Sequence, residues 1–198
     1  MNIIKRYTYF ELVGSSSTIQ KDLPIPTKSE NWIQWYAILS PSICTYCLLQ
    51  YGRIFPVNDP TLILPQVHDN CRCYVERLST YLAGTITDAG ENGTDIYLLL
   101  HHCLPNNYLT KEEARAQGWK SWLGNLNQVL PGMMIGGNIY KNRDKRLPTE
   151  PGRIWYEADL DYNGGYREGQ RILFSSDGLV FITFNHYLTF SEVILGGI

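Results

Sequence analysis

The sequence predicts an α+β protein in which N-terminal helices pack on a C-terminal antiparallel β-sheet, preceded by a small cysteine-rich module. Helix signals gather between residues 94 and 130, whereas strand-like alternation and turn signals dominate after residue 155. Four of the five cysteines fall between residues 44 and 73. We therefore expect an N-terminal Cys/His-rich module in residues 1–83, a linker in residues 84–93 and a second domain in residues 94–198.

The N-terminal segment carries weak local patterns. Pro24 and Pro26 interrupt the chain, and the segment from Thr27 to Glu30 has the composition of a helix start, with a helix expected to continue to Tyr36. Gly, Thr, Asp and Asn then dominate residues 83–93, which indicates a linker or loop.

Helix signals are clearer after the linker. Apolar residues at helical spacing predict a helix over residues 95–102. Thr110 and Glu113 form a capping box, in which each side chain accepts a backbone N–H of the other residue. Gly118 is suited to the left-handed position that ends the helix, and a shorter helical turn is expected over residues 125–130.

The last third of the chain predicts an antiparallel meander. Residues 155–162 alternate, so that Trp155, Glu157, Asp159 and Asp161 share one face of a strand. Gly- and Asp-rich turns separate three further strands, expected over residues 171–174, 179–184 and 187–193.

Charge limits the kind of partner. The net charge is −2, with +1 in residues 1–84 and −3 in residues 85–198, so a general basic coat for nucleic acid is excluded. Lys5 and Arg6 imitate a signal peptide, but Glu11 and the polar residues 14–18 interrupt the apolar run that should follow. We expect no signal peptide and no membrane span, so export would need another delivery route.

A series of short motifs runs through the second half in a fixed order. This series resembles the barnase-like microbial ribonucleases from about residue 94 to the end, and implies their fold. The motifs are Leu104-Pro105-Asn106-Asn107-Tyr108-Leu109-Thr110-Lys111, Gly118-Trp119, Gly124-Asn125-Leu126, Pro131-Gly132, Ile135-Gly136-Gly137, Asn142-Arg143, Gly152-Arg153-Ile154-Trp155, Glu157-Ala158-Asp159, Gly165-Tyr166-Arg167, Arg171-Ile172-Leu173, Ser175-Ser176-Asp177 and His186-Tyr187-Leu188-Thr189-Phe190.

The resemblance implies an endoribonuclease that cleaves single-stranded RNA without a metal and leaves a 2′,3′-cyclic phosphate. RNA carries its own nucleophile, the 2′-OH, so the enzyme must supply a base and an acid. By resemblance Glu157 is the base and His186 the acid. Lys111, Arg167 and Arg171 match the family positions that stabilise the charged phosphorane.

The remaining site residues are also carried over by resemblance. Asp159, on the same strand face as Glu157, would hold the two arginines in register. Asn142, Arg143 and Asp144 match the loop that recognises guanine, and Tyr187 is expected to contact substrate. Asp144 is one methylene shorter than the family's Glu, and Lys141 replaces a small hydroxyl residue, so guanine preference is expected to be weakened.

Taken singly, these residues have ordinary structural explanations. Glu157 alone would be interpreted as part of a solvated strand face, and His186 as a partly buried structural imidazole. Arg153 and Asp177 are interpreted as a structural ion pair that supports a hairpin. The catalytic interpretation depends on the joint occurrence of the others at matching positions.

The first half contains Cys44-x-x-Cys47 followed by His68-x-x-Cys71-x-Cys73. Cys44, Cys47, His68 and Cys71 supply four soft ligands for a structural Zn²⁺, with Cys73 as an alternative fourth ligand. Disulfides and reduced core thiols are competing interpretations. Cys103 is isolated and is expected to be a small core residue.

The same segment resembles the end of the phage Mu F-type minor head protein domain. The resemblance is confined to residues 44–73, where it rests on the Cys-x-x-Cys pair, Gly52 and Phe55, and Pro65-x-x-His68-x-Asn70-Cys71-Arg72-Cys73. It implies phage capsid or delivery machinery as a partner.

Together these resemblances predict a toxin or effector: a delivery module followed by a nuclease, released from the cell or associated with phage. They also imply an acidic immunity protein resembling barstar, which would cover the pocket formed by Lys111, Arg143, Arg167 and Arg171. Two alternatives are a non-catalytic phage-head or adaptor protein with a nuclease-like binding domain, and an exported degradative ribonuclease.

Overall fold

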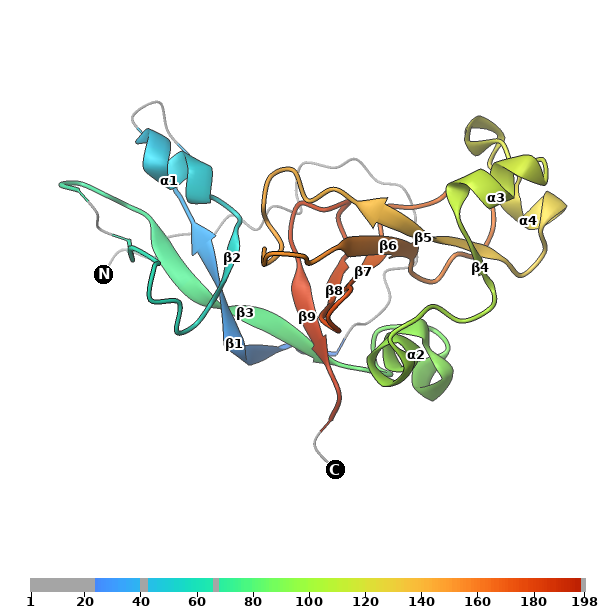
Figure 1. The fold of residues 1–198 in the computed structure, drawn as a ribbon, viewed down its shortest axis with the longest axis horizontal. Helices are drawn as coiled ribbons and strands as arrows, with labels where there is room; N and C mark the ends of the chain where they lie inside the picture. The colour runs from blue at the N-terminus through green and yellow to red at the C-terminus, as the bar shows by residue number, and fades with distance from the viewer. Residues whose placement is uncertain (1–23, 40–42, 66–67, 197–198) are drawn as a thin grey trace, which may run out of the picture.

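The computed structural model describes residues 24–39, 43–65 and 68–196. Its strands join into one nine-stranded sheet in the order β2-β1-β3-β9-β8-β7-β6-β5-β4 (Figure 1). The residues considered for a signal peptide lie outside the described part of the chain. In chain order the elements are β1 (Thr27–Tyr36), α1 (Thr45–Gln50), β2 (Ile54–Pro56), β3 (Tyr74–Leu82), η2 (Gly90–Asn92), α2 (Thr94–His101), β4 (Tyr108–Leu109), α3 (Lys111–Ala116), η3 (Ser121–Leu123), α4 (Leu126–Val129), β5 (Met134–Tyr140), β6 (Trp155–Asp159), β7 (Arg171–Ser175), β8 (Val180–Thr183) and β9 (Ser191–Ile194).

The α+β class is as expected, but the sheet is mixed. Strands β5 to β9 form the predicted antiparallel meander. Two pairs are parallel, namely β4 with β5 and β3 with β9. The parallel β3–β9 pair joins the N-terminal strands to the meander, so strands from both sides of the expected linker share one sheet. A layer of N-terminal helices on a purely antiparallel sheet is not confirmed.

The helix expected to start at Thr27 is wrong, because residues 27–36 form strand β1. This strand pairs antiparallel with β2 on one side and β3 on the other. A helix would bury only one stripe of this segment, whereas a central strand buries both faces, and Trp32, Ile33 and Trp35 are all buried. Pairing with two distant segments therefore overrides the local helix-start signal.

The hydrophobic core also joins the two halves of the chain. Trp32, Ile54 and Leu78 from the first half pack with residues of the second half, among them Trp155 and Phe181. The indole ring of Trp32 meets the Phe181 ring edge-on at 6.0 Å between centroids. On the opposite face of the meander, α2 packs its buried residues against a second cluster that includes Ala158, Leu160 and Ile172.

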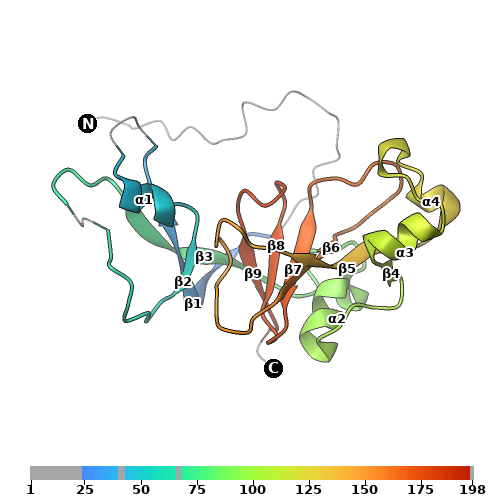
Figure 2. The ribbon, with the colours of Figure 1, turned by 45° about the horizontal axis from the view of Figure 1, so that its top comes forward.

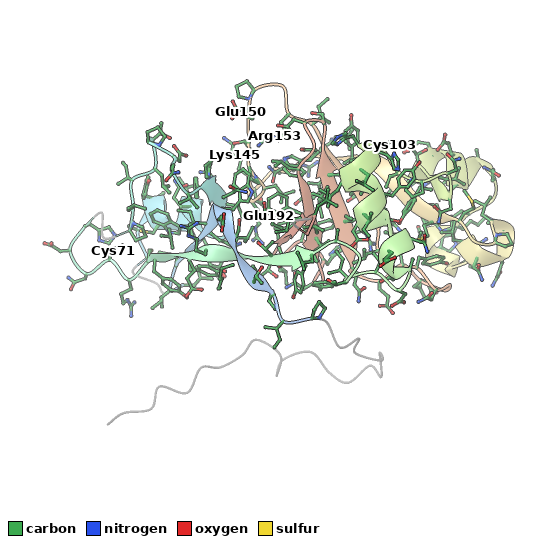
Figure 3. All side chains as sticks on the ribbon, turned by 90° about the horizontal axis from the view of Figure 1, so that it is seen from below. Cys71, Cys103, Lys145, Glu150, Arg153 and Glu192 are labelled. Carbon is green, nitrogen blue, oxygen red and sulfur yellow. The ribbon has the colours of Figure 1, made fainter. Side chains whose placement is uncertain are left out.

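A buried carboxylate fixes the junction between β3 and β9. Glu192 on β9 is only 7% exposed and accepts three hydrogen bonds, from Ser29 Oγ at 2.5 Å, Trp32 Nε1 at 3.0 Å and Thr80 Oγ1 at 3.2 Å. Figure 3 shows Glu192 near the middle of the molecule, where the two groups of strands meet. The junction between β3 and β9 is therefore held by specific hydrogen bonds as well as by the shared hydrophobic core.

Most of the local predictions for the second half are confirmed. The structure contains α2, the reciprocal capping box of Thr110 and Glu113, and a left-handed Gly118. Three strands are shorter than expected: β6 ends at Asp159 because Asp161 has a φ of 50°, β8 is limited to Val180–Thr183, and β9 begins only at Ser191. Arg153 and Asp177 form the expected ion pair.

Cys103 is not a core residue as expected. It is exposed just beyond the end of α2. Among the described residues, no helix combines the length and apolar character that crossing a bilayer requires. The helices α3 and α4 lie at the β4–β5 end of the sheet, far from α1 (Figures 1 and 2).

Candidate active site

Strand β6 places Glu157 and Asp159 on the sheet face opposite α2. Ala158, between them, points into the cluster packed by α2, so its neighbours must point the other way. Within the sheet, Asp159 lies opposite Arg171 on β7, and Glu157 lies opposite Asn138 on β5. Strand β6 thus holds the two carboxylates, two residues apart, between the neighbouring strands β5 and β7.

Both carboxylate oxygens of Glu157 accept short hydrogen bonds. Lys111 Nζ, from the first residue of α3, donates to Oε1 at 2.5 Å, and the Tyr187 hydroxyl donates to Oε2 at 2.5 Å. Burial raises the pKa of the Glu157 carboxyl, but these bonds and the charges of Lys111 and Arg167 lower it more. The net result is a pKa below the usual glutamate value, so Glu157 is ionised at neutral pH.

Asp159 holds both arginines. The guanidinium of Arg167 donates from Nε to both carboxylate oxygens at 2.9 Å and from Nη2 to Oδ1 at 2.7 Å. Arg171 Nη1 lies 3.3 Å from the same Oδ1. Arg171 Nη1 also donates to the backbone carbonyls of Glu168 and Gln170. Because Asp159 is almost fully buried, the two guanidinium groups are fixed in place rather than free to move in solvent.

The turn between β8 and β9 carries His186 and Tyr187. Both residues have a left-handed backbone, with φ of 54° and 67°, and the His186 N–H donates to the carbonyl of Gly169 at 3.1 Å. The His186 side chain is exposed, and its ring centroid lies 4.8 Å from that of Tyr187. Since Tyr187 binds Glu157, the turn holds the predicted acid beside the predicted base.

Tyr187 is wedged between the base and a neighbouring ring. It stacks on Tyr140 with centroids 5.0 Å apart, and burial together with the hydrogen bond to Glu157 raises the pKa of its hydroxyl. The hydroxyl therefore stays protonated and acts as a donor to the carboxylate. The nearby charges of Arg171 and Arg167 act on the pKa of Tyr187 in the opposite direction.

The loop of residues 141–147 follows β5 beside this turn. The side chain of Asn142, a residue expected to bind substrate, closes the loop: its Nδ2 donates to Leu147 O at 2.8 Å and its Oδ1 accepts from Leu147 N at 3.1 Å. Its side chain shapes the loop and is itself buried. Arg143 and Asp144 are exposed on the same loop.

Three residues that support this region were not identified from the sequence. Asn138 joins the helix α3 to the strand β5, because its Oδ1 accepts from Lys111 N at 2.9 Å. Tyr140 supports Tyr187 by stacking. Arg146 Nη1 donates to the carbonyls of Tyr187 and Leu188 at 3.1 and 2.8 Å, so it ties the 141–147 loop to the His186 turn. Only Arg146, in the run Lys141–Arg146 of charged residues, offered a local signal.

The cysteine-rich segment forms a separate cluster. The ligand atoms of Cys44, Cys47 and His68 lie within 4.8 Å of one another, as do those of Cys47, Cys71 and Cys73. The five predicted ligands are therefore brought together at the α1 end of the sheet, remote from the Glu157 site. Figure 3 shows Cys71 and Cys103 at well-separated places along the molecule.

Comparisons with known proteins agree on one part of the chain. A family model described as ribonuclease matches residues 94–194. Over 102 residues, 52% of the chain, the sequence is 45% identical to a ribonuclease of Heyndrickxia coagulans, of which the match covers 94%. The same identity is found to ribonucleases of Bacillus intermedius and Bacillus pumilus, in each of which the match covers 63% of the relative's length.

Proposed function

Because the chain belongs to the family of barnase-like microbial ribonucleases, we propose that it cleaves single-stranded RNA by metal-independent transphosphorylation. The products are a 2′,3′-cyclic phosphate and a free 5′-hydroxyl. The observation that carries the proposal is the ionised Glu157 carboxylate set among Lys111, Arg167 and Arg171, with His186 on the adjoining turn.

Glu157 acts as the base. Its lowered pKa keeps the carboxylate ionised, and a carboxylate oxygen takes the proton from the ribose 2′-OH as that oxygen attacks phosphorus. Both oxygens already accept hydrogen bonds, so the 2′-OH must replace one donor. Lys111 is the donor that leaves, because its side chain is 30% exposed whereas Tyr187 is held by stacking on Tyr140.

Once displaced, Lys111 turns towards the phosphate. It then joins Arg167 and Arg171, and the three cations face the extra negative charge of the phosphorane. Asp159 fixes the two guanidinium groups before substrate arrives, so little reorganisation is needed in the transition state.

His186 acts as the acid and protonates the departing 5′-oxygen. Its exposed ring is free to reach a bound phosphodiester, while the left-handed backbone and the N–H bond to Gly169 hold its position. DNA lacks the 2′-OH and cannot follow this path.

Guanine preference forms part of the proposal, in weakened form. The Asn142–Leu147 clamp gives the loop a fixed backbone that can present N–H groups to a base edge, and Asp144 supplies the carboxylate. Asp144 is shorter than the glutamate of the family pattern, so its hydrogen bond to guanine is longer or bent.

An effector role also remains a proposal. The cationic residues Lys111, Arg143, Arg167 and Arg171 lie in the acidic half of the chain, so an acidic, barstar-like inhibitor could be attracted to this site alone. Delivery outside the producing cell, by phage-derived or other machinery, belongs to the same proposal. Inhibition of RNA cleavage by an acidic protein encoded beside this chain, relieved at high salt, would support it.

The activity is tested with the full chain, a short oligoribonucleotide and excess EDTA. We expect cleavage that leaves cyclic-phosphate ends, detected by mass spectrometry, and no cleavage of the matching DNA. Glu157→Gln should lower kcat/KM by about 10²–10⁴-fold, which is the usual contribution of a general base. Glu150→Gln, an exposed change outside the site, is the matched control.

RNA binding without cleavage by the unaltered chain would instead support the non-catalytic adaptor. An unchanged rate for Glu157→Gln would remove Glu157 as the base.

A further inference from the structure

The cysteine-rich segment brings five metal-binding side chains together although they come from separate parts of the chain. Cys44 is the N-cap of α1 and Cys47 lies in its first turn, whereas His68, Cys71 and Cys73 precede strand β3. The two groups, Cys44–Cys47–His68 and Cys47–Cys71–Cys73, share Cys47. Two segments that are separated in the chain by β2 and its flanking loops therefore meet around one buried thiol.

Two of the spacings between donor atoms match the edges of a zinc tetrahedron. With Zn–S bonds of about 2.3 Å and a Zn–N bond of about 2.05 Å, tetrahedral angles require S···S edges of about 3.8 Å and S···N edges of about 3.6 Å. The structure has Cys47 Sγ 3.7 Å from Cys71 Sγ and 3.9 Å from His68 Nε2. A disulfide would require an S–S bond of about 2.05 Å, whereas the sulfur atoms of Cys47 and Cys71 lie 3.7 Å apart.

The neighbours of the ligands are arranged as for a metal site. Nδ1 of His68 is 2.8 Å from the carbonyl of Asp69, and because a carbonyl can only accept, this nitrogen carries the proton. Nε2 is then the unprotonated nitrogen, and it is the one that faces Cys47. The Cys47 N–H donates to Cys44 Sγ at 3.3 Å, which stabilises a thiolate at the start of α1.

We propose that this cluster binds one structural Zn²⁺ through Cys44, Cys47, His68 and Cys71. Cys71 is taken as the fourth ligand because its sulfur lies at the length of a tetrahedral edge from Cys47 Sγ, and Cys73, whose sulfur lies within 4.8 Å of both, is the alternative. Three thiolates and one neutral imidazole leave the site with one net negative charge.

The ion supplies stability that the local core lacks. The surrounding cluster has four buried residues, Ile33, Trp35, Cys47 and Phe55, and between β1 and β3 the described regular structure is limited to the short α1 and β2. A zinc ion would cross-link α1 to the segment that enters β3, and would thereby hold the outer end of the sheet.

The test measures metal and thiols on the full chain, so its readout is independent of RNA cleavage. The chain, purified without chelators from zinc-supplemented medium, should contain one zinc ion, measured by mass spectrometry of the metal. Cobalt exchange should give the intense visible bands of a tetrahedral site with thiolate ligands.

Variants then identify the ligands. Cys71→Ser should lower the zinc content to less than about a tenth of an equivalent after dialysis against a weak chelator, because one of four ligands is lost. Cys103→Ser, which alters an exposed cysteine away from the cluster, and Cys73→Ser should retain the full equivalent. Loss of zinc in Cys73→Ser with retention in Cys71→Ser would overturn the choice of fourth ligand.

Thiol titration of the unaltered chain tests the site without relying on the folding of any variant. Three of the five thiols should react slowly until a strong chelator is added, and then quickly. A chain without bound zinc whose thiols all react at once, or one whose thiols are lost to disulfides, would overturn the site. RNA cleavage should persist in the chelator in either case, since the two sites lie apart.

Discussion

Two aspartate–arginine pairs in this protein share the same geometry and differ in burial. Arg167 binds Asp159, and Arg153 binds Asp177, each through two contacts of 2.9 Å from Nε and one of 2.7 Å from Nη2. The Asp159 side chain is 3% exposed, whereas that of Asp177 is 46% exposed. Changing each aspartate to asparagine therefore compares a buried carboxylate, which also lies 3.3 Å from Arg171, with an exposed one.

We expect Asp159→Asn to cost about 3 kcal/mol of unfolding free energy. Removing one partner of a buried pair leaves an uncompensated charge, at about 3–5 kcal/mol. The lower end applies because asparagine keeps one acceptor and Arg167 retains some contact with solvent. Asp177→Asn should cost about 1 kcal/mol at most, since the Asp177 carboxylate is already largely solvated and Arg153 keeps its hydrogen bond to the Pro148 carbonyl. For a chain of this length, about 3 °C of melting temperature is lost per kcal/mol, so the two variants should differ by about 6 °C.

Urea unfolding followed by tryptophan fluorescence, at neutral pH and low salt, measures both free energies. Repeating the measurement at high salt should reduce the small loss in Asp177→Asn and leave that of Asp159→Asn almost unchanged, because only the exposed pair is screened. Equal losses in the two variants, or a loss below about 1 kcal/mol for Asp159→Asn, would refute the argument that burial fixes the site's arginines.

Four further predictions concern catalysis. Hydrogen-bond donors on both oxygens hold the pKa of Glu157 below its ordinary value, and the proposed mechanism requires the ionised form. Tyr187→Phe removes one donor, so it should raise this pKa and move the acidic limb of the kcat/KM profile to higher pH. An acidic limb that stays in place or moves to lower pH argues against this assignment. Lys111→Met should move the limb in the same direction and, through the lost cation, also lower kcat several-fold at the plateau. On the proposed guanine preference, Asp144→Glu should increase the ratio of cleavage after guanine to cleavage after other bases. Arg146→Met, which frees the 141–147 loop from the His186 turn, should raise KM more than it lowers kcat. Initial rates on defined dinucleotides measure both effects.

The sequence predicted elements whose determinants are local. The capping box needs only Thr110 and Glu113, and the spacing of Glu157 and Asp159 needs only the period of a strand. Such features depend little on the tertiary setting, which is why α2, the start of α3 and the order of the meander strands were predicted, although not the ends of β6 and β9. The cysteine cluster was also predictable, since its ligands are recognised by residue type and spacing.

The features that were not predicted from the sequence depend mainly on residues distant in the chain. Residues 27–36 become a strand because β2 and β3 bind both of its edges, and no local window contains those strands. In the sequence Glu192 is an ordinary strand residue, because its hydrogen-bond donors Ser29 and Trp32 lie near the other end of the chain. Likewise the sequence did not indicate that the Asn142 side chain hydrogen-bonds to Leu147 within its own loop.

The parallel pairing of β3 with β9 has a consequence for biosynthesis. Residues 80–82 lie beside residues 192–194, so nearly all of the ribonuclease segment, of which β9 is the last strand, is synthesised before these two strands can meet. On the ribosome, β3 has no such neighbour until nearly the last described residues have left the exit tunnel. Contacts of such long sequence separation form slowly, because a large loop must close before they stabilise anything. The N-terminal strands, although made first, are therefore expected to complete their folding last.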